Sequence, residues 1–364
     1  MAVHPAEKRV DGLERAAGLL GQARLPVIGG LLTDIAGTEA AIALARRLSG
    51  VIDHAAGEAL SRSTRLMHQV GGCLASFGEV RNRADLVIML GDTPLERNPD
   101  LLQDLFPAEE GLPRPGDNPR ELMVLGDRRK GKRRVPTTSI PLGDAKLPTL
   151  TAILAALVAG RLRGDAQGVD SKLAKLAERL RGAAFPVFVY SASDLDEPTM
   201  HVVHSMADYL CVTTRSAVLS LPALGNGDGV NLCSAWTCGV PVRTRFVKGL
   251  PQHDPWLYST KRLVDSGEAD ALLWIDALEA STAKSPRGVP TILLNAHQAS
   301  GTTDAEIVIE VACAGRDHDA EIYLPHISGI GMFKAIKPRT DIPTVAETID
   351  RINALLDSRE ARQC

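Results

Sequence analysis

The segment that most constrains the fold is a run of five apolar residues at positions 86–90, which lies between polar neighbours. So short a run, preceded by Asp85, is typical of a parallel strand buried on both faces. The residues before it, from Phe77 on, have the pattern of a helix. The turn that follows the strand contains Gly91, Asp92 and Pro94. In open α/β sheets ligands bind beside the carboxyl ends of the strands, so this turn is a candidate binding site.

The same order of helices and strands occurs twice along the 364 residues, which is length enough for two or three domains. Three apolar segments of the first half are matched in the second, in the pairs 25–28 and 185–190, 86–90 and 269–275, and 121–125 and 289–294. A further strand is predicted at 209–213. This self-similarity predicts an α/β protein of two Rossmann-like units, each a doubly wound and mostly parallel sheet, with a crevice between them.

Composition excludes several classes of protein. A net charge of −3 is not the charge of a nucleic-acid-binding chain. The longest mostly apolar stretch, residues 150–160, is too short to span a bilayer, and the first residues lack the apolar core of a signal peptide. The six cysteines include no C-x-x-C pair, which favours reduced thiols over a disulfide framework. We therefore expect a cytoplasmic protein.

No catalytic or metal-binding motif is present in the sequence. Gly29 and Gly30 end a predicted strand, but no dinucleotide or triphosphate fingerprint follows, so a tight turn is favoured. His201 and His204 share a helix face without a third ligand, and the spacing of Cys233 and Cys238 fits no standard metal site. We therefore predict no catalytic residue and no metal ligand.

A longer motif lies in the segment after Arg215. It has the spacing N-x4-W-x2-G-x-P-x4-F-x2-G-x-P-x3-P and consists of Asn231, Trp236, Gly239, Pro241, Phe246, Gly249, Pro251 and Pro255. Together with residues 77–99, this motif resembles the B subunit of formylmethanofuran dehydrogenase, a relative of the molybdopterin and tungstopterin oxidoreductases. The resemblance covers residues 25–335 approximately.

The sequence departs from the catalytic members of that family in every part that carries redox chemistry. Those members begin with a cysteine-rich iron–sulfur segment, whereas the first 72 residues here contain no cysteine. They carry a cysteine or selenocysteine metal ligand in the region of residues 55–61, where this chain has none. The resemblance therefore implies that the metal, the pterin and the iron–sulfur cluster have been lost.

Remnants of the pterin-binding turns are still recognisable. The turn with Gly91, Asp92 and Pro94 keeps the family's pattern, and two further turns keep only Arg128 and His297, respectively. The fourth turn, at residues 275–278, has lost the pattern. By the resemblance, these five residues mark the former pterin site, and no cofactor binding is expected of them now.

This eroded form resembles the B subunit of the bacterial formyltransferase/hydrolase complex of methylotrophs. The resemblance implies a non-catalytic scaffold, a pseudoenzyme, in one-carbon metabolism. The resemblance further implies that its complex acts in the oxidation of formaldehyde to formate but runs without electrons: one partner moves the formyl group from tetrahydromethanopterin onto a methanofuran-type carrier, methylofuran, and another cleaves it off. The implied partners are an amidohydrolase-type A subunit, a C subunit and a formyltransferase-type D subunit, with no nucleic acid and no membrane.

Two other functions stay open at this stage. One is an active molybdopterin or tungstopterin formylmethanofuran dehydrogenase subunit, and the other is an independent nucleotide-binding enzyme. The lack of a cysteine between Val51 and Gly72 favours the scaffold. The resemblance also suggests the domain division, with residues 1–55 and 181–364 in one unit and residues 56–180 in the other. Two contiguous halves that divide near residue 165 are the alternative.

One segment remains unexplained by the resemblance. Six of the seven residues at 128–134 are basic: Arg128, Arg129, Lys130, Lys132, Arg133 and Arg134. Such a run is either a solvated loop or an anion site, because like charges repel unless an anion neutralises them. Nucleic acid has no other support here. An acidic face of another protein in the complex, or the glutamate-rich tail of the furan carrier, is the alternative anion.

Overall fold

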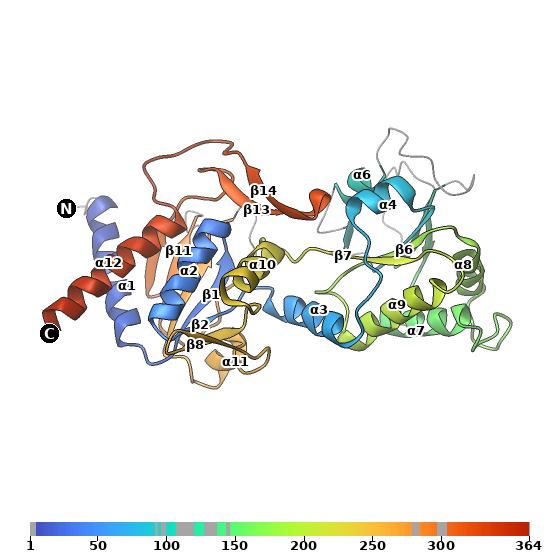
Figure 1. Ribbon diagram of the computed structural model, residues 1–364, viewed down its shortest axis with the longest axis horizontal. Coiled ribbons are helices and arrows are strands. Elements are labelled where there is room, and N and C mark those ends of the chain that lie inside the picture. Colours follow the sequence, from blue (N-terminus) through green and yellow to red (C-terminus); the bar gives the residue numbers. More distant parts are fainter. Residues whose placement is uncertain are drawn as a thin grey trace. The chain divides into compact units, whose positions relative to one another are not determined.

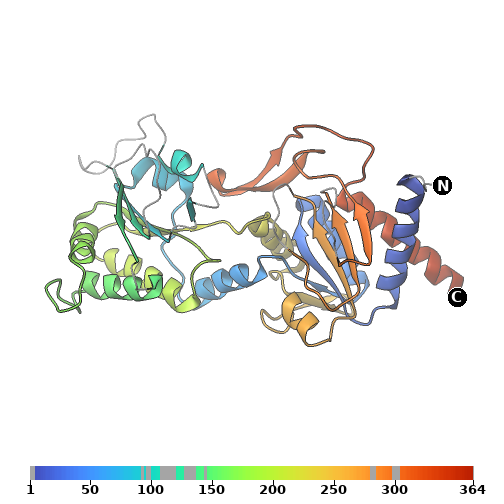
Figure 2. The ribbon, with the colours of Figure 1, turned by 180° about the vertical axis from the view of Figure 1, so that it is seen from behind.

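The computed structural model describes residues 5–91, 94–95, 100–106, 120–126, 137–142, 146–278, 284–296 and 304–363. The chain divides into two compact units (Figures 1 and 2). Unit 1 consists of Met1–Ser61, Ala223–Tyr323 and Gly329–Cys364, and unit 2 consists of Arg62–Pro222 and Leu324–Ser328.

Unit 1 is built on a seven-stranded sheet with the order β12-β11-β10-β1-β2-β8-β9. The five strands from β12 to β2 are parallel, and β8 pairs antiparallel with β2 and with β9. From β8 to β12 this is the Rossmann order, in which β8 takes the place of a third parallel strand. The strands are β1 (Pro26–Leu32), β2 (Val51–Ile52), β8 (Thr244–Val247), β9 (Leu250–His253), β10 (Ala271–Asp276), β11 (Thr291–Asn295) and β12 (Ile307–Glu310).

Helices cover both faces of the unit 1 sheet. On one face, Ile28 and Leu273 pack with Leu20, Leu44 and Ile352 in the larger core. On the other face, strand residues whose side chains point away from the larger core, such as Val27 and Leu272, pack against Leu263 of a short helix. The larger core is covered by α1 (Pro5–Gln22), α2 (Ile35–Arg47), α10 (Gly227–Cys238) and α12 (Val345–Gln363), and the smaller by α11 (Thr260–Asp265). The unit also holds most of β13 (Ala320–Leu324) and all of β14 (Gly329–Phe333), which pair with each other. The short helix η1 (Pro325–Ile327) between them belongs to unit 2.

Unit 2 has a five-stranded, fully parallel sheet with the order β5-β4-β3-β6-β7. Counted along the chain this is 3-2-1-4-5, again the Rossmann order. The strands are β3 (Leu86–Leu90), β4 (Glu121–Leu125), β5 (Thr137–Ile140), β6 (Pro186–Ser191) and β7 (Ala217–Leu221). Because all five residues of β3 are buried, its sequence is a continuous apolar run.

The helices of unit 2 also lie on both faces of its sheet, as Figure 1 shows for α4 and α6 on one side and α7 and α9 on the other. Phe77 and Leu105 pack on the face that Val87 and Val187 form. The helices are α3 (Gly57–Gln69), along which the chain enters the unit, α4 (Phe77–Arg83), α6 (Leu101–Leu105), α7 (Leu147–Val158), α8 (Ser171–Gly182) and α9 (Glu197–Leu210). None of the helices in the described parts of either unit is long and apolar enough to cross a membrane.

The predicted α/β fold with two Rossmann-like units is confirmed, whereas the crevice stays a prediction. The strand predicted at 209–213 is wrong. There α9 continues through Leu210, and the next strand is β7 at Ala217–Leu221. The helix forms here because the buried residues Val203, Ala207 and Leu210 follow the helical period and lie on one face of α9.

The observed division differs from the one predicted in where the chain returns to unit 1. The prediction placed the return at residue 181, with a division near 165 as the alternative, whereas the chain returns at Ala223. Residues 185–190 look locally like the first strand of a new unit. In the structure, however, β6 hydrogen-bonds to β3 and is the fourth strand of the unit that β3 begins.

Candidate functional site

The residues after β2 form a buried polar corner in unit 1. Asp53 follows the strand directly and is almost fully buried. One of its carboxylate oxygens accepts the N–H of His54 (2.9 Å), and the other accepts the N–H of Thr260 (2.8 Å), at the start of α11. Burial raises the pKa of the Asp53 carboxyl, against the opposing effects of the Arg243 guanidinium and the Thr260 N–H. This corner is where the resemblance places the lost metal ligand.

Arg243 supplies the countercharge from the start of β8. Its Nε lies 3.4 Å from Oδ1 of Asp53. Its terminal nitrogen donates to Glu58 on α3 (3.0 Å) and to the carbonyl oxygen of Pro255 (2.5 Å). Burial, hydrogen bonds and opposite charge together fix this side chain. The guanidinium therefore holds together three segments that are far apart in the sequence: the end of β2, the first turn of α3 and the turn after β9.

Gly57 allows α3 to begin this close to the corner. A Cβ at this position would lie 2.1 Å from Oδ1 of Asp53 and 3.2 Å from Nε of Arg243. Any larger residue would displace the carboxylate. The glycine in the segment 55–61 thus has a packing role.

His54 completes the corner as a neutral side chain. Its Nδ1 accepts the N–H of Ala56 (2.9 Å), so Nε2 carries the ring proton and donates to the carbonyl oxygen of Gly225 (3.0 Å). Burial lowers the pKa of His54 to about 4. Because both ring nitrogens are engaged, this imidazole binds no metal and accepts no substrate proton without breaking a hydrogen bond.

The motif residues of the segment 231–255 shape α10 and the β8–β9 hairpin, and Arg243 lies between these two elements. Oδ1 of Asn231 accepts the N–H of Val242 (3.1 Å), which ties α10 to the residue before Arg243. Gly239 ends α10 with a φ of +77°. Lys248 and Gly249, with φ of +51° and +78°, form a two-residue turn between β8 and β9.

Phe246 is fully buried in the larger core, so it anchors β8. Pro255 accepts a hydrogen bond from Arg243, as above. These motif residues therefore have structural roles, whereas Trp236 of the motif is 54% exposed. Arg243 could not be predicted from the sequence, because an arginine followed by Thr244 and Arg245 is typical of an exposed basic strand. The pairing of Arg243 with Asp53 carries no local signal.

Of the five remnant pterin-site residues, two lie in the described part of the chain. Gly91 ends β3 with a φ of +83° and donates its N–H to the carbonyl oxygen of Leu125 (2.9 Å), at the end of β4. Pro94 is buried. Asp92, Arg128 and His297 lie outside the described residues, as do Arg129, Lys130, Lys132, Arg133 and Arg134.

The histidines and cysteines weighed as metal ligands are engaged elsewhere. His204 is buried, and its Nε2 is 3.0 Å from the hydroxyl of Tyr190, whereas Nε2 of His201 lies 2.9 Å from Oε1 of Gln69. Cys233 is buried in the larger core of unit 1. Within the described ranges, no three His, Cys, Asp or Glu side chains form a group that could hold a metal ion.

The comparisons with known proteins agree on one relationship. No protein-family model matches the chain. The B subunit of the formyltransferase/hydrolase complex Fhc from Methylorubrum extorquens is 28% identical over 346 residues, which are 93% of each chain. The B subunit of the tungsten-containing formylmethanofuran dehydrogenase 2 from Methanocaldococcus jannaschii is 25% identical, over 91% of this chain and 80% of that protein.

A solved structure leads to the same protein class. The X-ray crystal structure of the complex FhcABCD from Methylorubrum extorquens, in complex with methylofuran, contains a chain that matches with a TM-score of 0.83 and 27% identity. The match covers 96% of both chains. The fold and the corner together define a protein of two Rossmann-like units, in which buried hydrogen bonds and an ion pair occupy the carboxyl end of β2. The chain is a homologue of the Fhc B subunit and is related to the B subunit of formylmethanofuran dehydrogenase, so the resemblance drawn from the sequence is confirmed.

Proposed function

We propose that this chain is a non-catalytic scaffold subunit of a formyltransferase/hydrolase complex. In this proposal the complex acts in the cytoplasm, in the oxidation of formaldehyde to formate by way of tetrahydromethanopterin and a methanofuran-type carrier, and its own steps are formyl transfer and hydrolysis without electrons. The observation that carries it is the similarity to the Fhc B subunit along nearly the whole length of both chains. The solved complex of that relative contains methylofuran, which supports a carrier of this class.

The buried corner supports the loss of redox chemistry. A molybdenum or tungsten centre of the related dehydrogenases takes a thiolate or selenolate ligand, and residues 55–61 contain neither. The imidazole of His54 has both nitrogens engaged, and Asp53 is bound to Arg243 and two N–H groups. The described residues of this corner do not fit a metal–pterin group, so we derive no step through one.

Exposed apolar side chains support a role in contacts between subunits. Leu250 and Trp256 are 69% and 67% exposed in the segment that carries the motif. Oδ1 of Asp254 accepts the N–H groups of Trp256 (2.8 Å) and Leu257 (2.7 Å), which fixes this turn. Exposed tryptophan on an ordered turn is typical of the centre of a protein interface. We assign this segment to contact with one of the other proteins of the complex, of the amidohydrolase (A), C or formyltransferase (D) type.

Assembly of the complex tests the scaffold role. The four subunits are coexpressed with a tag on the formyltransferase, with and without this chain. We expect the tag to recover all four proteins in the first case and an incomplete, inactive assembly in the second. A variant with Leu250→Ser and Trp256→Ser should lower recovery, whereas Val308→Ser, at an exposed apolar position on β12, serves as the matched control. An intact and active complex without this chain would refute the proposal.

The relationship to the tungsten-containing dehydrogenase keeps one alternative, an active pterin–metal oxidoreductase. Elemental analysis of the purified native complex separates the two functions. The scaffold predicts no molybdenum, tungsten or cluster iron that follows the amount of this chain. Near-stoichiometric tungsten or molybdenum would establish the alternative instead.

A further inference from the structure

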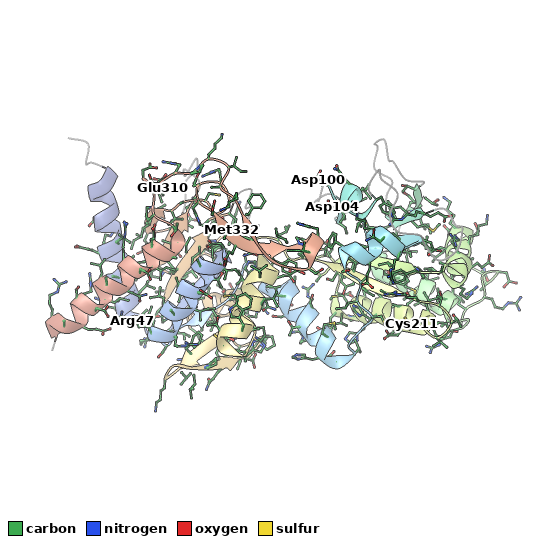
Figure 3. All side chains as sticks on the ribbon, turned by 45° about the horizontal axis from the view of Figure 1, so that its top comes forward. Arg47, Asp100, Asp104, Cys211, Glu310 and Met332 are labelled. Atoms are coloured by element: carbon green, nitrogen blue, oxygen red, sulfur yellow. The ribbon has the colours of Figure 1, made fainter. Side chains whose placement is uncertain are left out.

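Two cysteines of unit 2 lie side by side at its surface. Sγ of Cys211 is 3.6 Å from Sγ of Cys73, and both residues are exposed. Cys211 is the residue at which α9 ends, and Figure 3 labels it there. The two positions are 138 residues apart in the sequence, so only the fold brings them together. Because the pair forms no C-x-x-C motif, it could not be predicted from the sequence.

Backbone hydrogen bonds hold both cysteines in place. The carbonyl oxygen of Cys73 accepts the N–H of Val218 (2.8 Å), and Ala75 donates its N–H to the carbonyl oxygen of Val218 (2.9 Å). Residues 73–75 therefore form a single parallel bridge with β7, between Leu74 and Val218. On the other side, Cys211 donates its N–H to Ala207 (3.0 Å), within the last turn of α9. The approach of the two sulfurs is thus part of the folded structure of unit 2.

The two thiols interact with each other and with the residues around them. The hydrogen bond with Cys211, burial and the nearby Asp208 raise the pKa of Cys73 to about 11. The thiol of Cys73 therefore keeps its proton at neutral pH. Sγ of Cys211 also lies 3.2 Å from the carbonyl oxygen of Ser216, which orients it next to Cys73. Thiolates are the attacking species in disulfide exchange, and the two sulfurs lie close enough for one to attack a mixed disulfide formed on the other.

We propose that Cys73 and Cys211 form a reversible intramolecular disulfide with small disulfide oxidants of the glutathione class. One thiol of the pair loses its proton to solvent, and its thiolate attacks one sulfur of the oxidant, breaks the S–S bond and releases one glutathione thiolate. The second thiol then loses its proton to solvent, attacks the protein sulfur of this mixed disulfide and releases the second glutathione thiolate. The two protein thiols lose two electrons and two protons, and one glutathione disulfide is reduced to two glutathiones.

This bond would connect the bridged segment at residues 73–75 to the end of α9. Because it links residues far apart in the sequence, it restricts the unfolded chain and stabilises unit 2 against unfolding. This inference goes beyond the scaffold role, since it concerns the chain itself and needs no other protein of the complex.

The test uses the reduced full-length chain without oxygen. The chain is equilibrated with mixtures of oxidised and reduced glutathione, blocked with N-ethylmaleimide and mapped by mass spectrometry. We expect a linked Cys73–Cys211 peptide, two fewer blocked thiols and a rise in Tm of several degrees that dithiothreitol reverses. Cys73→Ser should leave glutathione attached to Cys211 and should abolish the rise. Cys238→Ser, a matched substitution in unit 1, should change neither result.

Two outcomes would overturn the proposal. In the first, Cys73 and Cys211 both remain open to N-ethylmaleimide at every glutathione ratio. In the second, glutathione stays attached to Cys211 in the unaltered chain as it does in Cys73→Ser, which would show that Cys73 does not complete the exchange. If the linked peptide forms with an unchanged Tm, the stabilising role is refuted.

Discussion

Arg243 and Asp53 form an ion pair of 3.4 Å inside unit 1, and both side chains are almost fully buried. Buried charges are expensive unless their partners and hydrogen bonds are complete. Here Asp53 accepts two N–H groups and Arg243 donates to two further acceptors, whereas Nε of Arg243 meets Asp53 as an ion pair without a hydrogen bond. The family motif at residues 231–255 therefore forms the structure that positions Arg243 next to Asp53.

Arg243→Met should therefore destabilise the chain strongly. It would leave the Asp53 carboxylate buried without its countercharge, and breaking such a pair costs roughly 3–5 kcal/mol. We expect a loss of this size in the free energy of unfolding, measured by urea denaturation of the purified chain.

Arg179→Met gives the matched control, because Arg179 and Glu121 form a partly exposed pair at 3.3 Å in unit 2. Such pairs contribute about 0–1 kcal/mol. Combining Arg243→Met with Asp53→Asn should recover part of the loss, since no buried charge then remains. Equal losses for Arg243→Met and Arg179→Met would contradict this account of the corner.

His54 predicts a specific dependence of stability on pH. Burial lowers its pKa in the folded chain from 6.5 to about 4, so between these values the unfolded chain binds the proton and the folded chain does not. Stability from this residue is therefore present above pH 6.5 and falls as the pH drops toward 4. The full loss is about 3 kcal/mol. Urea denaturation between pH 4.5 and pH 7 would measure it.

His54→Gln removes the titrating group and provides the comparison. The variant should be less stable at pH 7, because the hydrogen bonds to Ala56 and Gly225 are disturbed. Its stability should nevertheless fall less steeply toward low pH than that of the unaltered chain. If the two pH profiles run parallel, His54 is not the group responsible.

Gly30 is predicted to tolerate no side chain. Its φ is +76°, and a Cβ would lie 2.6 Å from the carbonyl oxygen of Ile275 and 3.0 Å from the ring of Trp274. Gly267 has a similar φ of +69°, but open space surrounds it. Gly267→Ala should cost roughly 1–2 kcal/mol from the backbone conformation alone. Gly30→Ala should cost a further 1–3 kcal/mol, approximately, for the steric overlap.

Thermal unfolding of the two alanine variants would show the difference as a clearly lower Tm for Gly30→Ala. Equal shifts would mean that β10 moves away from β1 without penalty. The register between these strands already shifts between Gly29 and Leu32, so the pairing is irregular at this point.

The sequence predicted those features that local patterns determine. The run at 86–90 marks β3 without ambiguity, because a strand buried on both faces needs apolar residues at every position. The position of β6 could not be predicted in the same way. Its residues look like the start of a unit, and only its hydrogen bonds to β3, 100 residues earlier, assign it to unit 2.

The buried corner escaped prediction for a related reason. Asp53 and Arg243 are 190 residues apart, and neither has an unusual neighbourhood in the sequence. Charged residues are usually exposed, so a buried pair is recognised only when its partner is known. The thiols of Cys73 and Cys211 present the same difficulty.

The basic segment at 128–134 gives the last prediction, which rests on the sequence. If it tethers the glutamate-rich tail of the furan carrier, each exposed contact contributes roughly 0.2–1 kcal/mol and weakens as salt screens it. Replacing Arg128, Arg129 and Lys130 with Ser should then lower the affinity of the assembled complex for the carrier. The effect should be largest at low ionic strength, and titration of the carrier at several salt concentrations would measure it.

A second variant with Ser at Lys132, Arg133 and Arg134 should behave in the same way, because the binding of an extended polyanion depends on the total positive charge and not on any one residue. The control carries Ser at Arg161, Lys172 and Lys175, three exposed basic residues of unit 2, and loses the same charge. If the tether exists, carrier affinity and its salt dependence change in both test variants and remain unchanged in the control. Equal behaviour of all three in an intact complex would leave the segment a solvated loop, since charge alone would not then bind the carrier there.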